Sequence, residues 1–437
     1  MVLDQSIRTN RTHARGDLEA QLVRAAEEFG TPLYVLDVAA IDAASTAMTA
    51  AFPSDWIRQY SLKANDLPAL VRLLADRGWG ANVVSAGEWA QARAAGVPNH
   101  RISFEGIGKT DAELAAAVAS VADGDPLRWV AVESPDEAHQ LAALADAAGL
   151  GRGDAPRLDV LLRVNPQVEP ETLPGLAVGA PASKFGMTEP EVLTLVRSGL
   201  DTTGLRVRGV HVHIGSNLAD VAAWTEAAVH AVRLLDQVAR HAPDADTVDF
   251  GGGFPLPAAG PAPDDFRTAL ADALSAADLQ MPARMAIEPG RYLVGAAGWL
   301  VGSVLHRRRR STHGHQLILD IGMTELLRPA LYGSRHAMHA LTAHGPGMQT
   351  AVEGPVCEST DSWGVHELPM LRRGDLVAVA DAGAYAASFT SRYNGRPHPA
   401  EVELWPGGTL EPGERVPVTR TSPTRPAQHR KKEPHPC

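Results

Sequence analysis

Short hydrophobic runs alternate with longer amphipathic stretches along the chain from Ala51 to about Arg291. The short runs have the length and apolar character of buried strands, and the longer stretches space their apolar residues as helices do. Eight predicted strands end near Leu62, Val84, Phe104, Val132, Val164, Ile214, Phe250 and Glu288. Predicted helices between them include Leu67–Arg77, Asp111–Ala122, Pro135–Ala148, Glu189–Ser198 and Val221–Arg240. This succession predicts a (β/α)8 barrel; an open doubly wound α/β sheet is the alternative, but it gives no reason to stop at eight strands.

The pattern changes after Arg291, where hydrophobic runs become short and glycine and proline turns separate them. Examples of such runs are Gln316–Ile321, Asp375–Ala380 and Ala400–Trp405. Short strands with turn residues between them and few helices are typical of a β-sandwich or barrel-like domain. Thr31–Asp37, near the N-terminus, is a further candidate strand of this domain.

The two patterns divide the chain. We expect residues 32–288 to form the barrel, and residues 1–31 with 289–418 to form the β domain. Residues 419–437 are rich in proline and basic side chains, which is the composition of a disordered tail. The predicted fold class is therefore α/β, a barrel followed by a C-terminal β domain.

Composition narrows the classes of protein. With 45% hydrophobic and 21% charged residues, the 437-residue chain is globular, and its formal charge of -11 argues against a general nucleic-acid or membrane surface. No apolar run approaches the ~18 residues of a membrane helix, and the N-terminus lacks the pattern of a signal peptide. Cys357 and Cys437 are the only cysteines, so a disulfide framework is excluded and a cytoplasmic location is expected.

A lysine, Lys63, follows directly on the first predicted barrel strand, Trp56–Leu62. The C-terminal ends of the strands form the catalytic face of a (β/α)8 barrel. An amine held there on a rigid element can act as a Schiff-base nucleophile. Taken alone, Leu62-Lys63-Ala64-Asn65 describes a solvated surface lysine at least as well. The other strand ends decide between the two interpretations.

Those strand ends carry polar and glycine residues: Ser85, Arg163, Asn165, His211, His213, Ser216, Gly251-Gly252-Gly253 and Glu288-Pro289-Gly290-Arg291. Glycines after a strand allow backbone amides to approach a phosphate, although three glycines alone are more often a tight turn. A lysine for an imine, glycines for a phosphate and an acid for a ring nitrogen together indicate pyridoxal phosphate. No metal is indicated.

Ten short strings, in order over most of the chain, carry a family resemblance. They are residues 31–37 (TPLYVLD), 62–65 (LKAN), 84–88 (VSAGE), 183–186 (SKFG), 213–216 (HIGS), 251–253 (GGG), 288–291 (EPGR), 328–332 (RPALY), 357–361 (CESTD) and 381–385 (DAGAY). With them the chain resembles the fold-type III pyridoxal-phosphate-dependent decarboxylases, most closely the diaminopimelate decarboxylase family. The resemblance implies a cofactor-binding barrel, a β domain and a homodimer whose active sites are shared across the interface.

The resemblance also implies a role for each residue around the cofactor. Lys63 would hold pyridoxal phosphate as a Schiff base, Glu288 would hydrogen-bond the pyridine nitrogen, and His213 would stack on the ring. The remaining cofactor-binding positions would be Ser216, Gly252, Gly253, Gly290, Arg291 and Tyr385. His211 shares a strand face with His213, and its role stays open between structural and functional.

In the β domain, Cys357 and Glu358 match a pair that reaches into the active site of the partner subunit. The cysteine there protonates Cα after decarboxylation, which needs a donor close to that carbon. A single cysteine is more often a buried small hydrophobe, but the surrounding Cys-Glu-Ser-Thr-Asp string favours the catalytic role. Cys437 is expected to have no specific role.

The predicted substrate ends in a carboxylate. By resemblance, Arg291, Arg328 and Tyr332 would bind this distal carboxylate. Tyr385 would contact both the substrate and the cofactor phosphate, and Glu358 would pair with the distal ammonium of the substrate. A guanidinium binds a carboxylate bidentately, and a diamine-forming enzyme has no use for two. The implied reaction is decarboxylation of meso-2,6-diaminopimelate at its D-centre to give L-lysine.

Three departures from the family pattern keep alternatives open. Asn82 stands where an aspartate is usual, Ile107 stands where an asparagine is common, and Thr172–Gly179 lacks the usual imidazole and aromatic. A decarboxylase of a related acid with a carboxylate-bearing side chain is the main alternative. A racemase or a cofactor-binding protein without turnover is a further one, although Lys63, Cys357 and Glu358 are all present.

Overall fold

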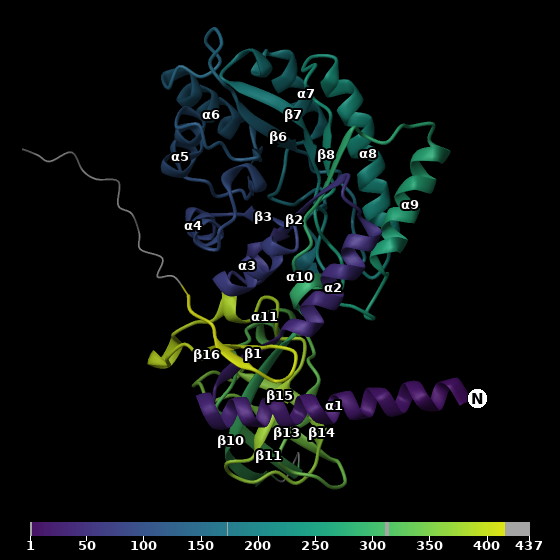
Figure 1. Cartoon of the computed structure of the whole chain (residues 1–437), viewed down its shortest axis with the longest axis vertical. Coiled ribbons are helices and arrows are strands. Elements are labelled where there is room, and N and C mark those ends of the chain that lie inside the picture. Colours follow the sequence, from purple (N-terminus) through teal and green to yellow (C-terminus); the bar gives the residue numbers. More distant parts are fainter. Residues whose placement is uncertain (1, 173, 311–313, 416–437) are drawn as a thin grey trace, which may run out of the picture.

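The chain forms a closed parallel barrel and a separate mixed sheet, seen in a computed structural model that describes residues 2–172, 174–310 and 314–415 (Figure 1). The barrel occupies the upper part of the view and the sheet the lower part. The basic tail predicted at residues 419–437, including Cys437, lies outside the described residues.

The barrel strands follow one another in sequence order, and the last pairs with the first. They are β2 (Trp56–Ser61), β3 (Gly80–Val83), β4 (Ile102–Phe104), β5 (Trp129–Val132), β6 (Leu158–Arg163), β7 (Leu205–His211), β8 (Thr247–Asp249) and β9 (Arg284–Ile287). Each observed strand ends at a predicted end or within a few residues of it. The predicted (β/α)8 barrel is confirmed.

Helices cover the outside of the barrel (Figure 1). They are α2 (Val38–Ala51), α3 (Pro68–Asp76), α4 (Ala86–Ala94), α5 (Asp111–Ala122), α6 (Pro135–Ala147), α7 (Glu189–Arg197), α8 (Ala222–Ala239) and α9 (Pro263–Ala276). Local sequence sets where they begin: Thr110 and Glu113 form a capping box on α5, and Ser134 caps α6. Their apolar faces pack against the strands in one continuous core.

The second sheet runs β14-β13-β11-β10-β1-β16-β17, with β15 also paired to β10 and β12 paired to β15. Its strands are β1 (Leu33–Asp37), β10 (Gly298–Arg310), β11 (Gly314–Leu319), β12 (Met338–Ala340), β13 (Met348–Glu353), β14 (Ser362–Leu368), β15 (Leu376–Val379), β16 (Ala400–Leu404) and β17 (Leu410–Pro412). The short helices α10 (Arg291–Val294) and α11 (Arg328–Tyr332) and several 3-10 turns complete the fold.

The N-terminal segment joins this sheet. β1 lies antiparallel to β10 and parallel to β16, so the predicted strand at Thr31–Asp37 belongs to the β domain, as expected. Helix α1 (Val2–Phe29) precedes it and packs Leu22 and Ala25 onto the sheet. β1 lies within the range 32–288 predicted for the barrel, but it pairs with the strands of the second sheet. The exact residues at which the two domains divide stay a prediction.

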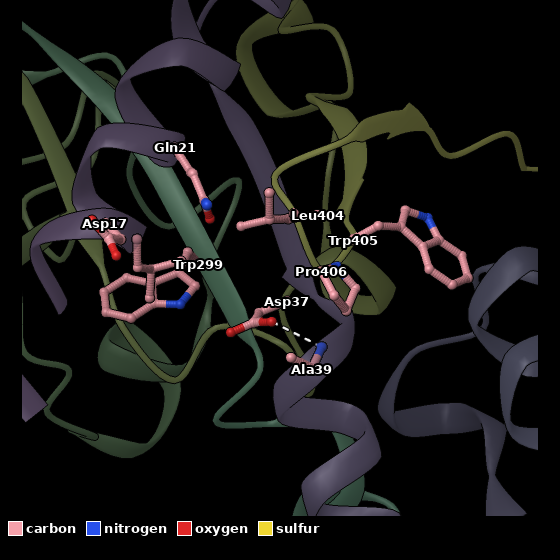
Figure 2. A pocket seen from close by; sticks show the side chains of 10 residues that line it. Asp17, Gln21, Asp37, Ala39, Trp299, Leu404, Trp405 and Pro406 are labelled. Carbon is pink, nitrogen blue, oxygen red and sulfur yellow. Dashed lines mark hydrogen bonds between the residues drawn. The ribbon is translucent and has the colours of Figure 1, made fainter. Parts of the chain in front are cut away.

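An open pocket of about 550 Å³ lies where α1, the start of α2 and the turn after β16 meet (Figure 2). Asp17, Gln21 and Trp299 line one side of it, and Leu404 and Trp405 another. None of the predicted site residues lines this pocket. None of the described helices is long and apolar enough to cross a membrane.

Candidate active site

The residues predicted to bind the cofactor come together at the C-terminal ends of the barrel strands. They line one small cavity: Lys63, His213, Ser216, Gly252, Gly253, Glu288, Gly290, Arg291 and Tyr385. A larger cavity of about 350 Å³ shares Lys63, His213 and Glu288 with it and adds Arg163, Phe185 and Glu105, among others. Parallel strands bring their carboxyl ends to one edge, which explains why residues far apart in sequence meet here.

Lys63 lies in a 3-10 turn, Leu62–Ala64, directly after β2. A segment of the β domain holds this turn in place. Ser388 Oγ donates to the Lys63 carbonyl at 3.0 Å, and Tyr385 N donates to the Ala64 carbonyl at 2.7 Å. Asn65 Nδ2 donates to the carbonyl of Gly383 at 3.2 Å. The second domain therefore fixes the backbone from which the lysine projects.

Glu288 follows β9 and is almost fully buried. Asn82 Nδ2 donates a hydrogen bond to its Oε1, and His211 Nε2 lies 3.6 Å from its Oε2. Burial by itself raises the pKa of Glu288, but the adjacent charge of His211, with Lys63 and Arg163, outweighs burial and lowers it. The carboxylate is therefore ionised at neutral pH. Asn82, one of the departures from the family pattern, donates to Glu288 where an aspartate would place a second carboxylate.

His213 is held as a neutral imidazole. Gly252 N donates to its Nδ1 at 3.1 Å, so this nitrogen carries a lone pair. Burial lowers the pKa of His213 well below its usual range, and the charges of Lys63 and Arg163 lower it further. A neutral ring fixed by the glycine turn suits stacking on an aromatic cofactor better than a hydrated imidazolium would.

The glycines form a tight cradle at this end of the barrel. A Cβ on Gly252 would lie 2.7 Å from the Glu288 carbonyl oxygen, and one on Gly253, whose φ is +107°, would lie 2.7 Å from Leu218 Cδ1. Only glycine fits at these two positions. Arg291 donates to Ser216 Oγ at 2.9 Å beside the cradle. A backbone free of side chains, a hydroxyl and a guanidinium fit the phosphate of pyridoxal phosphate.

Two buried arginines gather around Tyr385. The guanidinium carbon of Arg291 lies 4.8 Å from the Tyr385 ring centroid, and that of Arg328 lies 6.0 Å from it. Burial and the neighbouring charge of Arg291 lower the pKa of Arg328 to about 10. Among the described residues, no carboxylate forms an ion pair with either guanidinium, and Arg328 Nε has no hydrogen-bond acceptor. Two unpaired cations this close form a site for an anion.

Tyr332 and the altered segment Thr172–Gly179 lie together near this cluster. A Cβ on Gly175 would lie 2.9 Å from Tyr332 Cε1, so a larger side chain at this position would require the Tyr332 ring to shift. Thr172 Oγ1 donates to the Ser216 carbonyl at 2.6 Å, and Val178 N donates to that of Ile214 at 2.8 Å. Leu173 itself lies outside the described residues.

Cys357 and Glu358 stand apart from these cavities. They are exposed on the loop between β13 and β14, where Cys357 N donates to Asn394 Oδ1 at 3.3 Å. Tyr393 Oη donates to Glu358 Oε1 at 2.6 Å. Neither residue lines the cavities that contain Lys63. Within one chain, the structure does not bring them to the lysine.

Two acidic residues at the site were not anticipated. Glu133, directly after β5, pairs with Arg163, whose Nη1 lies 2.5 Å from its Oε1, and the Arg163 guanidinium lies 4.9 Å from the Phe185 ring centroid. Glu105, directly after β4, lies 2.8 Å from His211 Nδ1. The sequence signal was available: each acid directly follows the apolar residue that ends a buried strand, Phe104 or Val132.

A barrel of this topology, with a lysine after its first strand, a glycine cradle and a buried acid, defines the fold-type III class of pyridoxal-phosphate enzymes. In agreement, residues 38–295 match the family model described as the pyridoxal-dependent decarboxylase, pyridoxal binding domain. The chain is a pyridoxal-phosphate-dependent decarboxylase and belongs to the diaminopimelate decarboxylase family.

Relatives in this family cover most of the chain. Diaminopimelate decarboxylase from Aquifex aeolicus is 36% identical over 384 residues, which is 86% of this chain and 87% of that protein. The Deinococcus radiodurans protein is 37% identical over 385 residues, covering 88% and 92%. Among solved structures, the Methanocaldococcus jannaschii enzyme in complex with L-lysine matches with a TM-score of 0.80 at 30% identity, over 90% of this chain and 91% of that one.

Proposed function

We propose that this protein decarboxylates meso-2,6-diaminopimelate at its D-centre and releases L-lysine, as a cytoplasmic homodimer of lysine biosynthesis. The observation that carries the proposal is the pair of buried guanidinium groups, Arg291 and Arg328, that lie against Tyr385 at the edge of the cofactor cavity with no carboxylate of the described chain to neutralise them. A substrate with a distal carboxylate supplies the missing charge. The relatives that share this fold include enzymes solved in complex with L-lysine.

Pyridoxal phosphate, when bound, supplies an electron sink for the electron pair released as the bond between Cα and its carboxylate breaks. Lys63 would hold it covalently through its amine, and the cradle of Gly252, Gly253 and Ser216 would bind its phosphate. Glu288, buried and ionised, would accept a hydrogen bond from the pyridine nitrogen and so keep that nitrogen protonated. His213 would pack on the ring as a neutral imidazole.

The cavity beside Lys63 suits loss of a charged carboxylate as neutral carbon dioxide. Val84, Ile107, Val178 and Phe185 contribute apolar wall to it. Apolar walls exclude water from the reacting carbon and favour the neutral product over the carboxylate. A proton must then be delivered to Cα.

For that proton we assign Cys357 of the partner subunit, with the partner's Glu358 binding the distal ammonium of the substrate. Both side chains are exposed on a loop of the β domain and lie outside their own chain's cavities. Exposure on a short, hydrogen-bonded loop suits residues that complete a neighbouring site across a two-fold interface. The homodimer is part of this proposal.

A second candidate function is decarboxylation of a related amino acid whose side chain also bears a carboxylate. The segment Thr172–Gly179 favours it, since this segment lacks the imidazole and aromatic side chains usual in the family and packs Gly175 against Tyr332 instead. The two candidates are separated by a panel of substrates. Turnover on meso-diaminopimelate that exceeds turnover on every related acid supports the first, and the reverse order supports the second.

Replacing Arg328 with methionine tests the recognition of a carboxylate. Arg328→Met keeps the length of the side chain and removes the guanidinium, so we expect KM for meso-diaminopimelate to rise about 10- to 100-fold. The value of kcat should fall less, because the contact lies at the far end of the substrate. Arg335→Met, which removes an exposed arginine from the loop after α11, is the control. Equal KM values for the two variants would remove Arg328 from the substrate site.

A further inference from the structure

A row of three charged side chains lies in the wall of the cavity that contains Lys63. Glu105 follows β4, His211 ends β7 and Glu288 follows β9. His211 Nδ1 lies 2.8 Å from Glu105 Oε2, and its Nε2 lies 3.6 Å from Glu288 Oε2. The side chains are only 2% exposed for His211 and 4% for each acid. Water therefore does not screen the interactions among them.

The contacts of His211 determine whether its imidazole carries one proton or two. Neither nitrogen of His211 has another hydrogen-bond partner among the described residues. A neutral imidazole carries one donor and one lone pair, so one carboxylate would face a lone pair across a buried contact. Protonation of both nitrogens removes this conflict. In agreement, although burial alone lowers the pKa of His211, the charges of Glu105 and Glu288 raise it well above its usual range.

No other group in contact with Glu288 can replace this cation. The titratable groups that face the row from neighbouring elements are Asp249 on β8, Arg163 on β6, His213 after β7 and Lys63 after β2. Asp249 is a buried acid whose pKa is raised by burial and by Glu288, and Arg163 is already paired with Glu133. Lys63 is the residue assigned to hold the cofactor. The cation that touches Glu288 is His211.

We propose that Glu105 and His211 are positioning residues for the pyridine nitrogen: Glu105 holds His211 as an imidazolium, and this imidazolium keeps Glu288 ionised and oriented toward the ring nitrogen. The function of His211 is then neither contact with substrate nor simple packing. Glu105 acts on the cofactor only through His211 and Glu288. The proposal rests on pyridoxal phosphate being bound with Glu288 at its ring nitrogen, as argued above, and not on the identity of the substrate.

The test measures cofactor binding rather than turnover. Apoenzyme is titrated with pyridoxal phosphate and with its 1-deaza analogue, in which a carbon replaces the ring nitrogen, and the Kd of each is read from the Schiff-base absorbance. Wild-type protein should prefer the natural cofactor. In Glu105→Gln this preference should fall about tenfold, the effect of shifting the pKa of one coupled group by about one unit. Affinity for the analogue should stay near the wild-type value.

The pH dependence gives a second readout with a defined sign. The raised pKa of His211 means that its proton is held at neutral pH and is lost only as pH rises through that raised value. Without Glu105, the proton is lost at lower pH. The preference for the natural cofactor should therefore decline at a lower pH in Glu105→Gln than in wild-type protein.

Two further variants keep the test decisive. His211→Gln, whose amide can hydrogen-bond but carries no charge, should lose the preference at every pH and serves if Glu105→Gln does not fold. Asp159→Asn is the matched control, since it removes one carboxylate from an ion pair with Arg206 on β6 and β7 away from the cavities. If Glu105→Gln and His211→Gln raised the Kd of pyridoxal phosphate and of its 1-deaza analogue by the same factor, the role of the two residues would be purely structural and the proposal would be overturned. Because no substrate is used, failure of meso-diaminopimelate turnover leaves this outcome unaffected.

Discussion

Lys63→Ala is expected to reduce decarboxylation by at least about a thousandfold, because the variant loses the amine that would hold the cofactor covalently and release it to the substrate. The loss should persist at saturating pyridoxal phosphate, since the cradle formed by the glycines and Ser216 can still bind phosphate. The measurement is the rate of carbon dioxide release, together with the absorbance of the Schiff base.

The matched control for this variant is Lys184→Ala. Lys184 is exposed, whereas Lys63 lies at the junction of the two cavities. The control should keep the Schiff-base absorbance and Lys63→Ala should lose it. If Lys63→Ala turned over substrate at the wild-type rate, the assignment of this lysine would be wrong.

Cys357→Ala is expected to lower turnover about 10²- to 10⁴-fold, the usual contribution of a positioned general acid. Cofactor binding should be unchanged, because Lys63, Glu288 and the glycine cradle, which would hold the cofactor, are intact in this variant. Carbon dioxide release and Schiff-base absorbance therefore separate this variant from Lys63→Ala. Cys357→Ala with wild-type turnover would contradict the role as proton donor.

Mixing the two inactive variants tests whether the site is shared. If Cys357 of the partner subunit completes each site, a mixed dimer of Lys63→Ala and Cys357→Ala chains contains one intact site. With random exchange of subunits, about half of the dimers are mixed and about a quarter of all sites are intact. Activity should return to about a quarter of the wild-type value. A mixture that stays inactive after exchange has been verified would place both residues in the same chain's site.

The barrel could be predicted from sequence because its signal is local and repeated. Each strand is a short apolar run that ends in a polar or glycine residue, as at Leu62-Lys63 and Phe250-Gly251. Parallel strands of one barrel must end on the same face, so the predicted cofactor residues had to lie close together. Family resemblance then assigned roles that spacing alone could not.

The parts that were missed depend on long-range contacts. Helix α1 begins with few apolar residues, and it is held by Leu22 and Ala25 against the sheet, a contact that local pattern does not reveal. The row of Glu105, His211 and Glu288 joins three strands that are distant in sequence. The sequence alone therefore leaves the role of His211 open between structural and functional. In the proposal, Cys357 completes the site of a second chain, which the pattern along its own chain does not reveal.

The most direct test of the central claim is to incubate purified protein, saturated with pyridoxal phosphate, with meso-2,6-diaminopimelate and to quantify both products. We predict carbon dioxide and L-lysine in equal amounts, with turnover abolished in Lys63→Ala. Protein that shows an intact Schiff-base absorbance and yet forms no L-lysine from this substrate would contradict the proposed function.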